Sequence, residues 1–268
     1  MKKTILITGA TDGIGLATAT KLVELGHHVL LHGRNKAKLE DTRKKLFALN
    51  SNAHIEVYVA DLSVLKEVKS LAVEVSKNNK QLDVLVNNAG VYVVNEKVSV
   101  DGLDTRFVVN AIAPFLLTKL LMPLFDKTGR IINLSSAAQA SFNPGDLTST
   151  NRQSDAVVYA QSKLALTMWS AGLAKKLMNK GPVVIAVNPG SMLGSKMVKE
   201  AYGVSGKDIQ IGANILCELA LHDEYKNASG KYFDNDSGQF TSPHPDAVNS
   251  SKNQQVINVI EEILDNIQ

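Results

Sequence analysis

Short, continuously apolar runs rich in β-branched residues alternate with longer amphipathic stretches from the start of the chain to about residue 190. The runs predicted to be strands are Thr4–Thr8, His28–His32, Ile55–Ala60, Val84–Asn87, Ile131–Leu134 and Val183–Asn188. The stretches predicted to be helices are Gly15–Leu25, Lys36–Leu49, Val64–Lys77, Asp104–Phe125 and Val157–Met178. Strands without polar alternation are typical of a sheet covered on both faces, and alternating strands and helices imply right-handed crossovers. The pattern predicts an α/β fold with a doubly wound parallel sheet, the Rossmann fold.

The chain has 268 residues, which suits one large α/β domain, and no Pro-, Gly- or Ser-rich boundary divides it. Residues 1–268 are therefore predicted to form a single dinucleotide-binding domain. Two segments break the rhythm: 139–155 is polar and rich in turn residues, and 191–208 mixes apolar residues with glycines. Because long loops in compact domains often carry function, we expect both to face a substrate; the alternative is that each is a plain surface loop.

Composition excludes several classes of protein. The 29 basic and 26 acidic residues leave a formal charge of only +3, which excludes strong binding to nucleic acid, and the 44% of apolar residues excludes a largely disordered chain. One cysteine, Cys217, excludes an internal disulfide and is interpreted as a packed core thiol in a reducing compartment. The most apolar segment, Ala111 to Phe125, contains Pro114 and Lys119, so no membrane span is expected. These features predict a cytoplasmic protein.

A glycine-rich turn links the first predicted strand to the first predicted helix, with the spacing Gly-x-x-x-Gly-x-Gly. Glycines let the backbone turn sharply and approach a pyrophosphate at the helix N-terminus. Any tight strand-to-helix turn can use glycines, but this position in the chain favours a dinucleotide. The residues assigned to the cofactor here are Gly9, Thr11, Asp12, Gly13, Ile14 and Gly15.

The end of the second predicted strand indicates which dinucleotide is bound. An acidic residue there favours a free ribose 2′-hydroxyl, whereas this chain has no acid and places Arg34 just after the strand. The planar guanidinium suits a phosphate, so we expect NADP rather than NAD. Asp12 would repel a 2′-phosphate weakly, and the alternative role of Arg34 is a solvated side chain before the second helix.

Tyr159 and Lys163 lie four residues apart on a predicted helix, so both side chains share one face. A nearby ammonium group lowers the pKa of a tyrosine toward the range useful for proton transfer. Such a pair arises often by chance, but polar residues follow two predicted strands at the carboxyl edge of the sheet, where ligands bind. Those residues are Ser135, Ser136 and the segment 87–90, and Asn110 lies within a nearby predicted helix.

Taken in order, these motifs resemble the short-chain dehydrogenase/reductase family, in its compact branch and specifically its retinol-dehydrogenase-like reductases. The resemblance covers residues 4 to about 200. It rests on the glycine-rich turn 8–15, Asp61-Leu62, the segment 87–90, Asn110, Ser136, Tyr159 with Lys163, and the segment 188–190. The long spacing between Ser136 and Tyr159 and the stretch Gly230-Lys231-Tyr232-Phe233 carry the likeness to the retinol-dehydrogenase-like members.

The resemblance implies a catalytic role for four residues. Tyr159 is the general acid/base and Ser136 orients the carbonyl or hydroxyl group. Lys163 binds the nicotinamide ribose and tunes Tyr159, and Asn110 supports a proton relay through water. The further cofactor contacts that the resemblance implies are Asp61 and Leu62 on the adenine side, Asn87, Ala89 and Gly90 near the ribose, and Pro189 and Gly190 at the nicotinamide end. The threonine that often follows Pro-Gly in the family is missing here, and Ser195 is a candidate to replace it.

The predicted function is therefore an NADP(H)-dependent oxidoreductase that transfers hydride between the cofactor and a lipophilic carbonyl or alcohol. The alternatives are a non-catalytic NADP(H)-sensing protein and an epimerase or dehydratase that uses the same Tyr/Lys pair. The six histidines have no metal-ligand spacing, so no metal is expected. The resemblance implies a homodimer or homotetramer through the helices that carry Asn110 and Tyr159, although relatives with long insertions can be monomeric.

Overall fold

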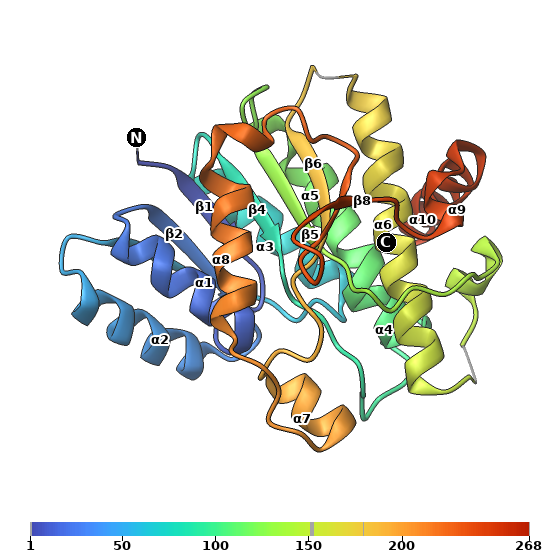
Figure 1. Ribbon diagram of the computed structural model, residues 1–268, viewed down its shortest axis with the longest axis horizontal. Coiled ribbons are helices and arrows are strands. Elements are labelled where there is room, and N and C mark those ends of the chain that lie inside the picture. Colours follow the sequence, from blue (N-terminus) through green and yellow to red (C-terminus); the bar gives the residue numbers. More distant parts are fainter. Residues whose placement is uncertain (1, 151–152, 179, 268) are drawn as a thin grey trace.

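The computed structural model describes residues 2–150, 153–178 and 180–267. At its centre lies an eight-stranded sheet in the order β3-β2-β1-β4-β5-β6-β7-β8 (Figure 1). The strands are β1 Thr4–Ile7, β2 His28–Gly33, β3 His54–Val59, β4 Val84–Asn87, β5 Arg130–Leu134, β6 Val183–Asn188, β7 Tyr232–Asp234 and β8 Gln239–Thr241. Neighbouring strands are parallel except β7 and β8, which are antiparallel. The predicted doubly wound parallel sheet is confirmed.

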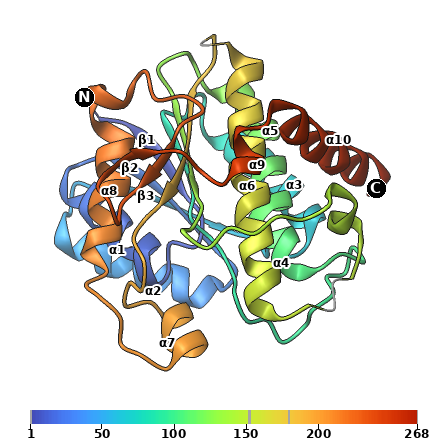
Figure 2. The ribbon, with the colours of Figure 1, turned by 45° about the vertical axis from the view of Figure 1, so that its right-hand side comes forward.

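Helices cover both faces of the sheet (Figures 1 and 2). The α-helices are α1 Gly13–Glu24, α2 Lys36–Leu49, α3 Leu65–Asn78, α4 Thr105–Phe107, α5 Ala113–Leu121, α6 Asp155–Leu177, α7 Lys196–Tyr202, α8 Gln210–Leu221, α9 Pro245–Val248 and α10 Ser250–Asn266. The short turns are the π-helix η1 Val108–Ile112 and the 3₁₀ helices η2 Met122–Leu124, η3 Pro144–Thr148 and η4 Asp223–Tyr225. Helices α1, α2 and α8 pack on one face, and α3, α5, α6 and α10 on the other.

The strands supply both halves of the core because successive side chains point to opposite faces. In β1, Ile5 and Ile7 pack with α1 and α8, whereas Leu6 packs with the helices of the other face. Ile131 and Ile132 of β5 divide in the same way. This two-sided burial explains why the strands contain no polar alternation.

One of the predicted helices is not regular over its whole length. The stretch Asp104–Phe125 is not one regular helix: α4 is followed by the π-helix η1, then by α5 and η2. Single π-helical turns widen a helix locally and occur frequently at functional sites. Within the described residues, Thr105–Leu124 is long and apolar enough to cross a membrane by length and composition, but most of it is buried in the fold, as in a core helix.

Helix α10 packs along α6, and Lys119 Nζ of α5 lies 3.2 Å from Glu261 Oε1 of α10. The helices that the resemblance assigns to subunit contact are therefore partly covered by this chain's own C-terminal helix. Trp169 of α6 is fully buried and makes an edge-to-face contact with Phe115. Its role is therefore core packing.

Candidate active site

The glycine-rich turn is packed too tightly for side chains. Gly9 and Gly13 have positive φ angles of 67° and 55°. A Cβ at Gly15 would lie 2.3 Å from Gly9 O and 2.4 Å from Asn88 Nδ2, so only glycine fits. Asn88 Nδ2 donates to Thr8 O at 2.7 Å and to Gly9 O at 3.2 Å, which ties the end of β4 to this turn. The sequence placed Asn88 in the segment 87–90 at the carboxyl edge but did not indicate this contact with the glycine-rich turn.

The side chains between the glycines lie at the N-terminus of α1. Asp12 caps that helix by accepting a hydrogen bond from Gly13 N at 2.7 Å. Thr11 lies against the end of β2, where a Cβ at Gly33 would be 3.1 Å from Thr11 Cγ2. Ile14 packs against α8. The helix N-terminus at Gly13, where an added Cβ would be in ordinary contact with Ser195 Cβ at 3.7 Å, fits the pyrophosphate of a dinucleotide.

His32 hydrogen-bonds to the glycine-rich turn and helps to fix its position. Its Nδ1 lies 3.4 Å from Gly9 N and its Nε2 3.1 Å from Ala60 O, so the ring bridges the ends of three strands. The Ala60 carbonyl can only accept, and therefore Nε2 carries the proton and Nδ1 accepts from Gly9 N. Burial lowers the pKa of His32 to about 4, so the ring is neutral at pH 7.

The predicted adenosine contacts lie at the ends of β2 and β3. Arg34 is exposed directly after β2 and forms no ion pair among the described residues. Asp61 accepts from Ser63 N and Ser63 Oγ at 2.9 and 2.7 Å, which fixes its carboxylate beside the sheet edge. Leu62 is buried in the core, so a cofactor contact from this residue would have to use its backbone.

Ser136 follows β5, and its hydroxyl hydrogen-bonds to the hydroxyl of Tyr159 in the first turns of α6. Burial raises the pKa of Tyr159, the Ser136 hydrogen bond opposes that rise, and the nearby Tyr202 adds to it. Tyr92 packs on the Tyr159 ring with 4.7 Å between ring centroids. The structure therefore brings the two predicted catalytic hydroxyl groups together.

Lys163 lies on the same face of α6 as Tyr159, with Nζ 5.7 Å from the centre of the Tyr159 ring. Its ammonium donates to Leu134 O at 2.7 Å, and burial lowers its pKa to about 8. The expected lowering of the Tyr159 pKa by Lys163 is not found: the pKa is raised, because burial dominates and Lys163 is bonded to the backbone instead.

Asn110 lies in the π-helix η1 and is turned toward the strand ends. Its amide exchanges hydrogen bonds with the backbone of Val91, at 2.8 and 2.9 Å, and donates to Ser162 Oγ at 2.9 Å. A Cβ at Gly90 would lie 3.2 Å from Lys163 Nζ and 3.3 Å from Asn110 Oδ1. Gly90 therefore lets the backbone after β4 pass close to both residues, and the water relay through Asn110 stays a prediction.

Asn87, which the resemblance assigns to the ribose region, has a side chain that is hydrogen-bonded within the fold. Its Nδ2 donates to Thr118 Oγ1 at 3.1 Å and to Asn133 Oδ1 at 2.8 Å, so the side chain points into the core. Only its backbone remains for a cofactor, because the last residue of β4 faces α5 rather than the sheet edge. Ala89 N donates to Thr8 Oγ1 at 3.0 Å, at the edge itself.

The segment after β6 is held by the hairpin between β7 and β8. Gly190 adopts a φ of 123°, and Asn235 Nδ2 donates to Pro189 O at 2.9 Å. Asp236 accepts from Ser191 N at 2.9 Å and also from the Ser191 hydroxyl. Ser195 caps α7, and its Cβ lies 3.7 Å from where a Cβ at Gly13 would be. Its role in place of the missing threonine stays a prediction.

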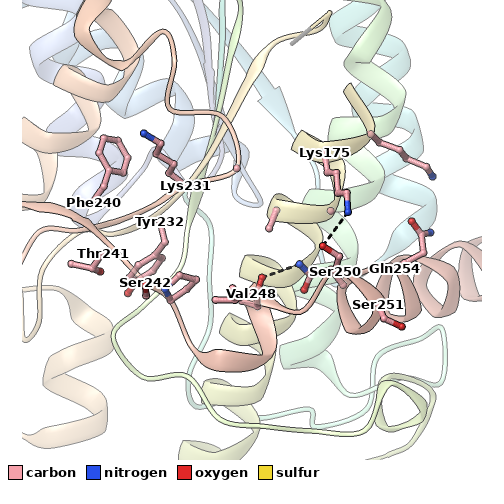
Figure 3. A pocket seen from close by; sticks show the side chains of 17 residues that line it. Lys175, Lys231, Tyr232, Phe240, Thr241, Ser242, Val248, Ser250, Ser251 and Gln254 are labelled. Atoms are coloured by element: carbon pink, nitrogen blue, oxygen red, sulfur yellow. Dashed lines mark hydrogen bonds between the residues drawn. The ribbon is translucent and has the colours of Figure 1, made fainter. Parts of the chain in front are cut away.

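Two side chains hydrogen-bond to the backbone carbonyl of Ser136. Tyr232 in β7 and Gln139 both donate to Ser136 O at 3.0 Å. Tyr232 lines a cavity of about 950 Å³ between α6, β8 and α10, which none of the predicted catalytic residues lines (Figure 3). The sequence indicated Tyr232 only through the Gly230–Phe233 likeness and gave no signal for its contact with Ser136.

The two predicted substrate-facing segments lie in different places. In 191–208, Tyr202 approaches Tyr92 with 5.8 Å between ring centroids, so α7 lies near Tyr159. In 139–155, Gln139 lies beside Ser136, but η3 packs against α10 and Leu147 is fully buried. Residues 151–152 of that segment lie outside the described residues.

Comparison with known proteins agrees with this geometry. The family model for short chain dehydrogenase matches residues 3–203. Short-chain dehydrogenase TIC 32 A, chloroplastic, from Brassica napus is 35% identical over 253 residues, which cover 86% of this chain and 79% of that protein. Human retinol dehydrogenase 13 is 32% identical over 251 residues, which cover 87% of this chain and 76% of that protein.

A solved structure is similar as well. The Pseudomonas aeruginosa RhlG/NADP active-site complex superposes with a TM-score of 0.71 at 26% sequence identity. The match covers 87% of this chain and 94% of RhlG. NADP-bound proteins thus occur among those that share this fold.

Proposed function

The chain belongs to the short-chain dehydrogenase/reductase family of oxidoreductases, and on that premise we propose that it transfers hydride between NADP(H) and a lipophilic carbonyl or alcohol. The observation that carries this proposal is the hydrogen-bonded pair of Ser136 and Tyr159 at the carboxyl edge of the sheet, with Lys163 buried beneath it. A nicotinamide cofactor, when bound, supplies the hydride, and the protein supplies orientation and the proton.

In the proposed mechanism Tyr159 gives its proton to the substrate oxygen during reduction and takes one back during oxidation. The raised pKa of Tyr159 keeps the phenol protonated at pH 7, which suits it to act as the acid. Ser136 donates to the same substrate oxygen as negative charge grows there. Lys163, whose pKa is about 8, carries its proton on most molecules at pH 7; it lies beside Gly90 and would hold the ribose of the cofactor.

NADP is favoured over NAD by the end of β2. Arg34 is exposed, follows the strand directly and has no ion-pair partner among the described residues, so its guanidinium is free to bind a phosphate. Asp12, the nearest predicted source of repulsion, is bonded to Gly13 N. The NADP found in the RhlG complex supports the same choice.

A lipophilic substrate is favoured by the side chains around Tyr159. Tyr92 packs on its ring and Tyr202 on Tyr92. Val93, next to Tyr92 in the chain, and Val157, two residues before Tyr159, are exposed large apolar residues, as is Met192 after β6. Exposed apolar groups gathered at one place typically mark a binding surface for an apolar partner.

The test is a panel of aldehydes and ketones of increasing chain length, assayed with NADPH and with NADH at equal concentration. We expect NADPH oxidation with apolar carbonyls and at least about tenfold higher kcat/KM with NADPH than with NADH, from one charge-assisted phosphate contact. Tight NADPH binding without oxidation of any panel member would instead support a sensing protein. A preference for NADH would refute the role given to Arg34.

A further inference from the structure

Strand pairing at the amino edge of the sheet brings two histidines together. His28 is the first residue of β2 and His54 the first of β3, and the two are register partners. Glu56 is two residues beyond His54 and therefore points to the same face of the sheet. One ligand atom from each of these three residues lies within 4.8 Å of the other two. We name His28, His54 and Glu56 the amino-edge cluster.

The two imidazoles are stacked, with centroids 3.7 Å apart and planes inclined by 14°. His28 Nε2 is 2.9 Å and His54 Nε2 3.9 Å from Glu56 Oε1, so both ring nitrogens face one carboxylate oxygen. His28 is 8% exposed, and its Nε2 has no partner aligned for a hydrogen bond. A buried ring nitrogen without an aligned partner is costly unless something else binds it.

The carboxylate of Glu56 is oriented from the other side. Its Oε2 accepts from the hydroxyl of Tyr58 and from Asn79 Nδ2 at 3.4 Å, and Asn79 Nδ2 also donates to Tyr58 OH at 2.9 Å. These contacts hold Oε2 and leave Oε1 directed at the histidines. Hydrogen bonds of this kind orient the ligands of metal ions in proteins.

We propose that the amino-edge cluster is a binding site for a divalent cation of the Zn²⁺ type, with His28 Nε2, His54 Nε2 and Glu56 Oε1 as protein ligands and water in the remaining position. Two imidazoles and one carboxylate form a donor set that Zn²⁺ accepts and that Mg²⁺ and Ca²⁺ do not favour. Tetrahedral binding places ligand atoms about 3.4 Å apart. His28 Nε2 and Glu56 Oε1, 2.9 Å apart, must therefore separate slightly, and His54 Nε2, 3.9 Å from Glu56 Oε1, must move closer. The His54 side chain is 59% exposed and free to turn.

The surroundings set the strength of this site. Burial lowers the pKa of His28, and His54 and Lys2 lower it further, while Glu56 raises it. Lys2 also places a positive charge near the cation and weakens its binding. The free thiol of Cys217 is buried, and its pKa is raised to about 11, so it does not compete for the metal.

The proposed site differs from the expectation that no metal is bound. The histidines were scattered in the sequence because residues 28 and 54 meet only through the pairing of β2 with β3. The cluster lies at the edge of the sheet opposite to Ser136 and Tyr159. The proposed metal site therefore does not depend on the proposed reaction being correct.

The experiment is calorimetric titration of the full chain with ZnCl₂ at pH 7.5, repeated for His54→Ala and for Glu56→Gln. We expect one Zn²⁺ per chain, at least about tenfold weaker binding in either variant, and a rise in melting temperature with Zn²⁺ that is smaller in both variants than in the unchanged protein. The matched control is His222→Ala, an exposed histidine 4.0 Å from Glu224, which should bind Zn²⁺ like the unchanged chain. No Zn²⁺ binding, or equal affinity in His54→Ala, would overturn the proposal; NADPH affinity should be the same in all four proteins.

Discussion

Strand β2 carries a histidine at each end, and the two have opposite environments. His32, at the carboxyl end, is 2% exposed, and both of its ring nitrogens have backbone partners in Gly9 and Ala60. His28, at the amino end, is 8% exposed but has an Nε2 atom without an aligned partner. Similar burial thus leads to a structural role at one end and a ligand-binding role at the other, according to which hydrogen bonds are already made.

The two edges of the sheet differ in the same way as the two histidines: at one edge the polar side chains already have hydrogen-bond partners, and at the other a ring nitrogen lacks an aligned partner. At the carboxyl edge, Asn88, Asn110 and Tyr232 each hydrogen-bond to backbone near the proposed reaction site. These contacts fix positions without touching a substrate, as preorganised sites require. At the amino edge we find the cluster of His28, His54 and Glu56. Changes at the carboxyl edge should therefore affect catalysis, and His54→Ala at the amino edge should not.

The largest effect is expected from Tyr159→Phe, which removes the proposed proton donor but keeps the ring that packs on Tyr92. We predict a fall in kcat/KM of about 10²- to 10⁴-fold, the range for general acid catalysis. NADPH affinity, measured by fluorescence titration, should change less than threefold, because the ring still fills its place. If Tyr159→Phe had the same kcat/KM as His54→Ala, residues at the carboxyl edge would have no larger part in catalysis than those at the amino edge.

Gly15→Ala is expected to act nearly as strongly through the backbone. Its Cβ would meet Gly9 O and Asn88 Nδ2 at 2.3 and 2.4 Å, so the glycine-rich turn must move. We predict a loss of about 100-fold in kcat/KM for NADPH, as for an ångström-scale misplacement. Gly145→Ala is the control, since no atom lies within 4 Å of its added Cβ. Equal NADPH kinetics in both variants would show that the turn does not bind the cofactor.

Arg34→Ala should reduce the preference for NADPH over NADH. The loss of one charge-assisted hydrogen bond, about 1.5–3 kcal/mol, lowers the NADPH-to-NADH ratio of kcat/KM roughly 10- to 100-fold. Kinetics with NADH should be unchanged. Arg43→Ala is the control, because its side chain is paired with Glu40 2.9 Å away on α2. An unchanged ratio in Arg34→Ala would assign NADP recognition to another residue.

Tyr232→Phe should have a smaller effect, through Ser136. It removes one hydrogen bond to Ser136 O, worth about 0.5–1.5 kcal/mol, so we predict a decrease in kcat of up to about tenfold with unchanged NADPH affinity. A role in folding alone would lower the melting temperature and leave kcat unchanged. Tyr225→Phe is the control, since its ring packs beside Phe233 without a contact to Ser136.

The smallest effect concerns pH. Burial lowers the pKa of Lys163 to about 8, so the ammonium form is present below that pH and is lost as the pH rises through it. Because NADPH is anionic, its affinity should weaken about threefold to tenfold between pH 7 and pH 9. Lys163→Met should show weaker binding and no such dependence. A pH-independent Kd in the unchanged protein would contradict the placement of Lys163 at the cofactor.

How well the sequence predicts a feature of this structure depends on whether the interactions that form it are local or join residues far apart in the chain. The strands β1 to β6 and the polar residues at their carboxyl ends were predictable, because continuous β-branched runs and the rule for doubly wound sheets are local signals. The π-helix at Val108–Ile112 was not, since tertiary contacts of Asn110 accompany it. Strands β7 and β8 have only three residues each, too few for a periodic pattern.

Long-range contacts account for the other differences. Asn87 and Asn88 are neighbours in the sequence, yet one points into the core and the other reaches the glycine-rich turn, as alternation about the end of β4 dictates. The contact of Tyr232 with Ser136 and the pairing of His28 with His54 join residues far apart in the chain. No spacing rule in a single sequence reports such pairs.

The most direct test of the proposed reaction follows a deuterium atom. NADPH deuterated at C4, on each face in turn, is incubated with the best carbonyl substrate of the panel, and the alcohol is analysed by mass spectrometry. We predict that one of the two labelled cofactors transfers its deuterium to the carbonyl carbon, and that Tyr159→Phe gives almost no labelled product. Alcohol formed without deuterium from either labelled cofactor would contradict direct hydride transfer from the C4 position of NADPH.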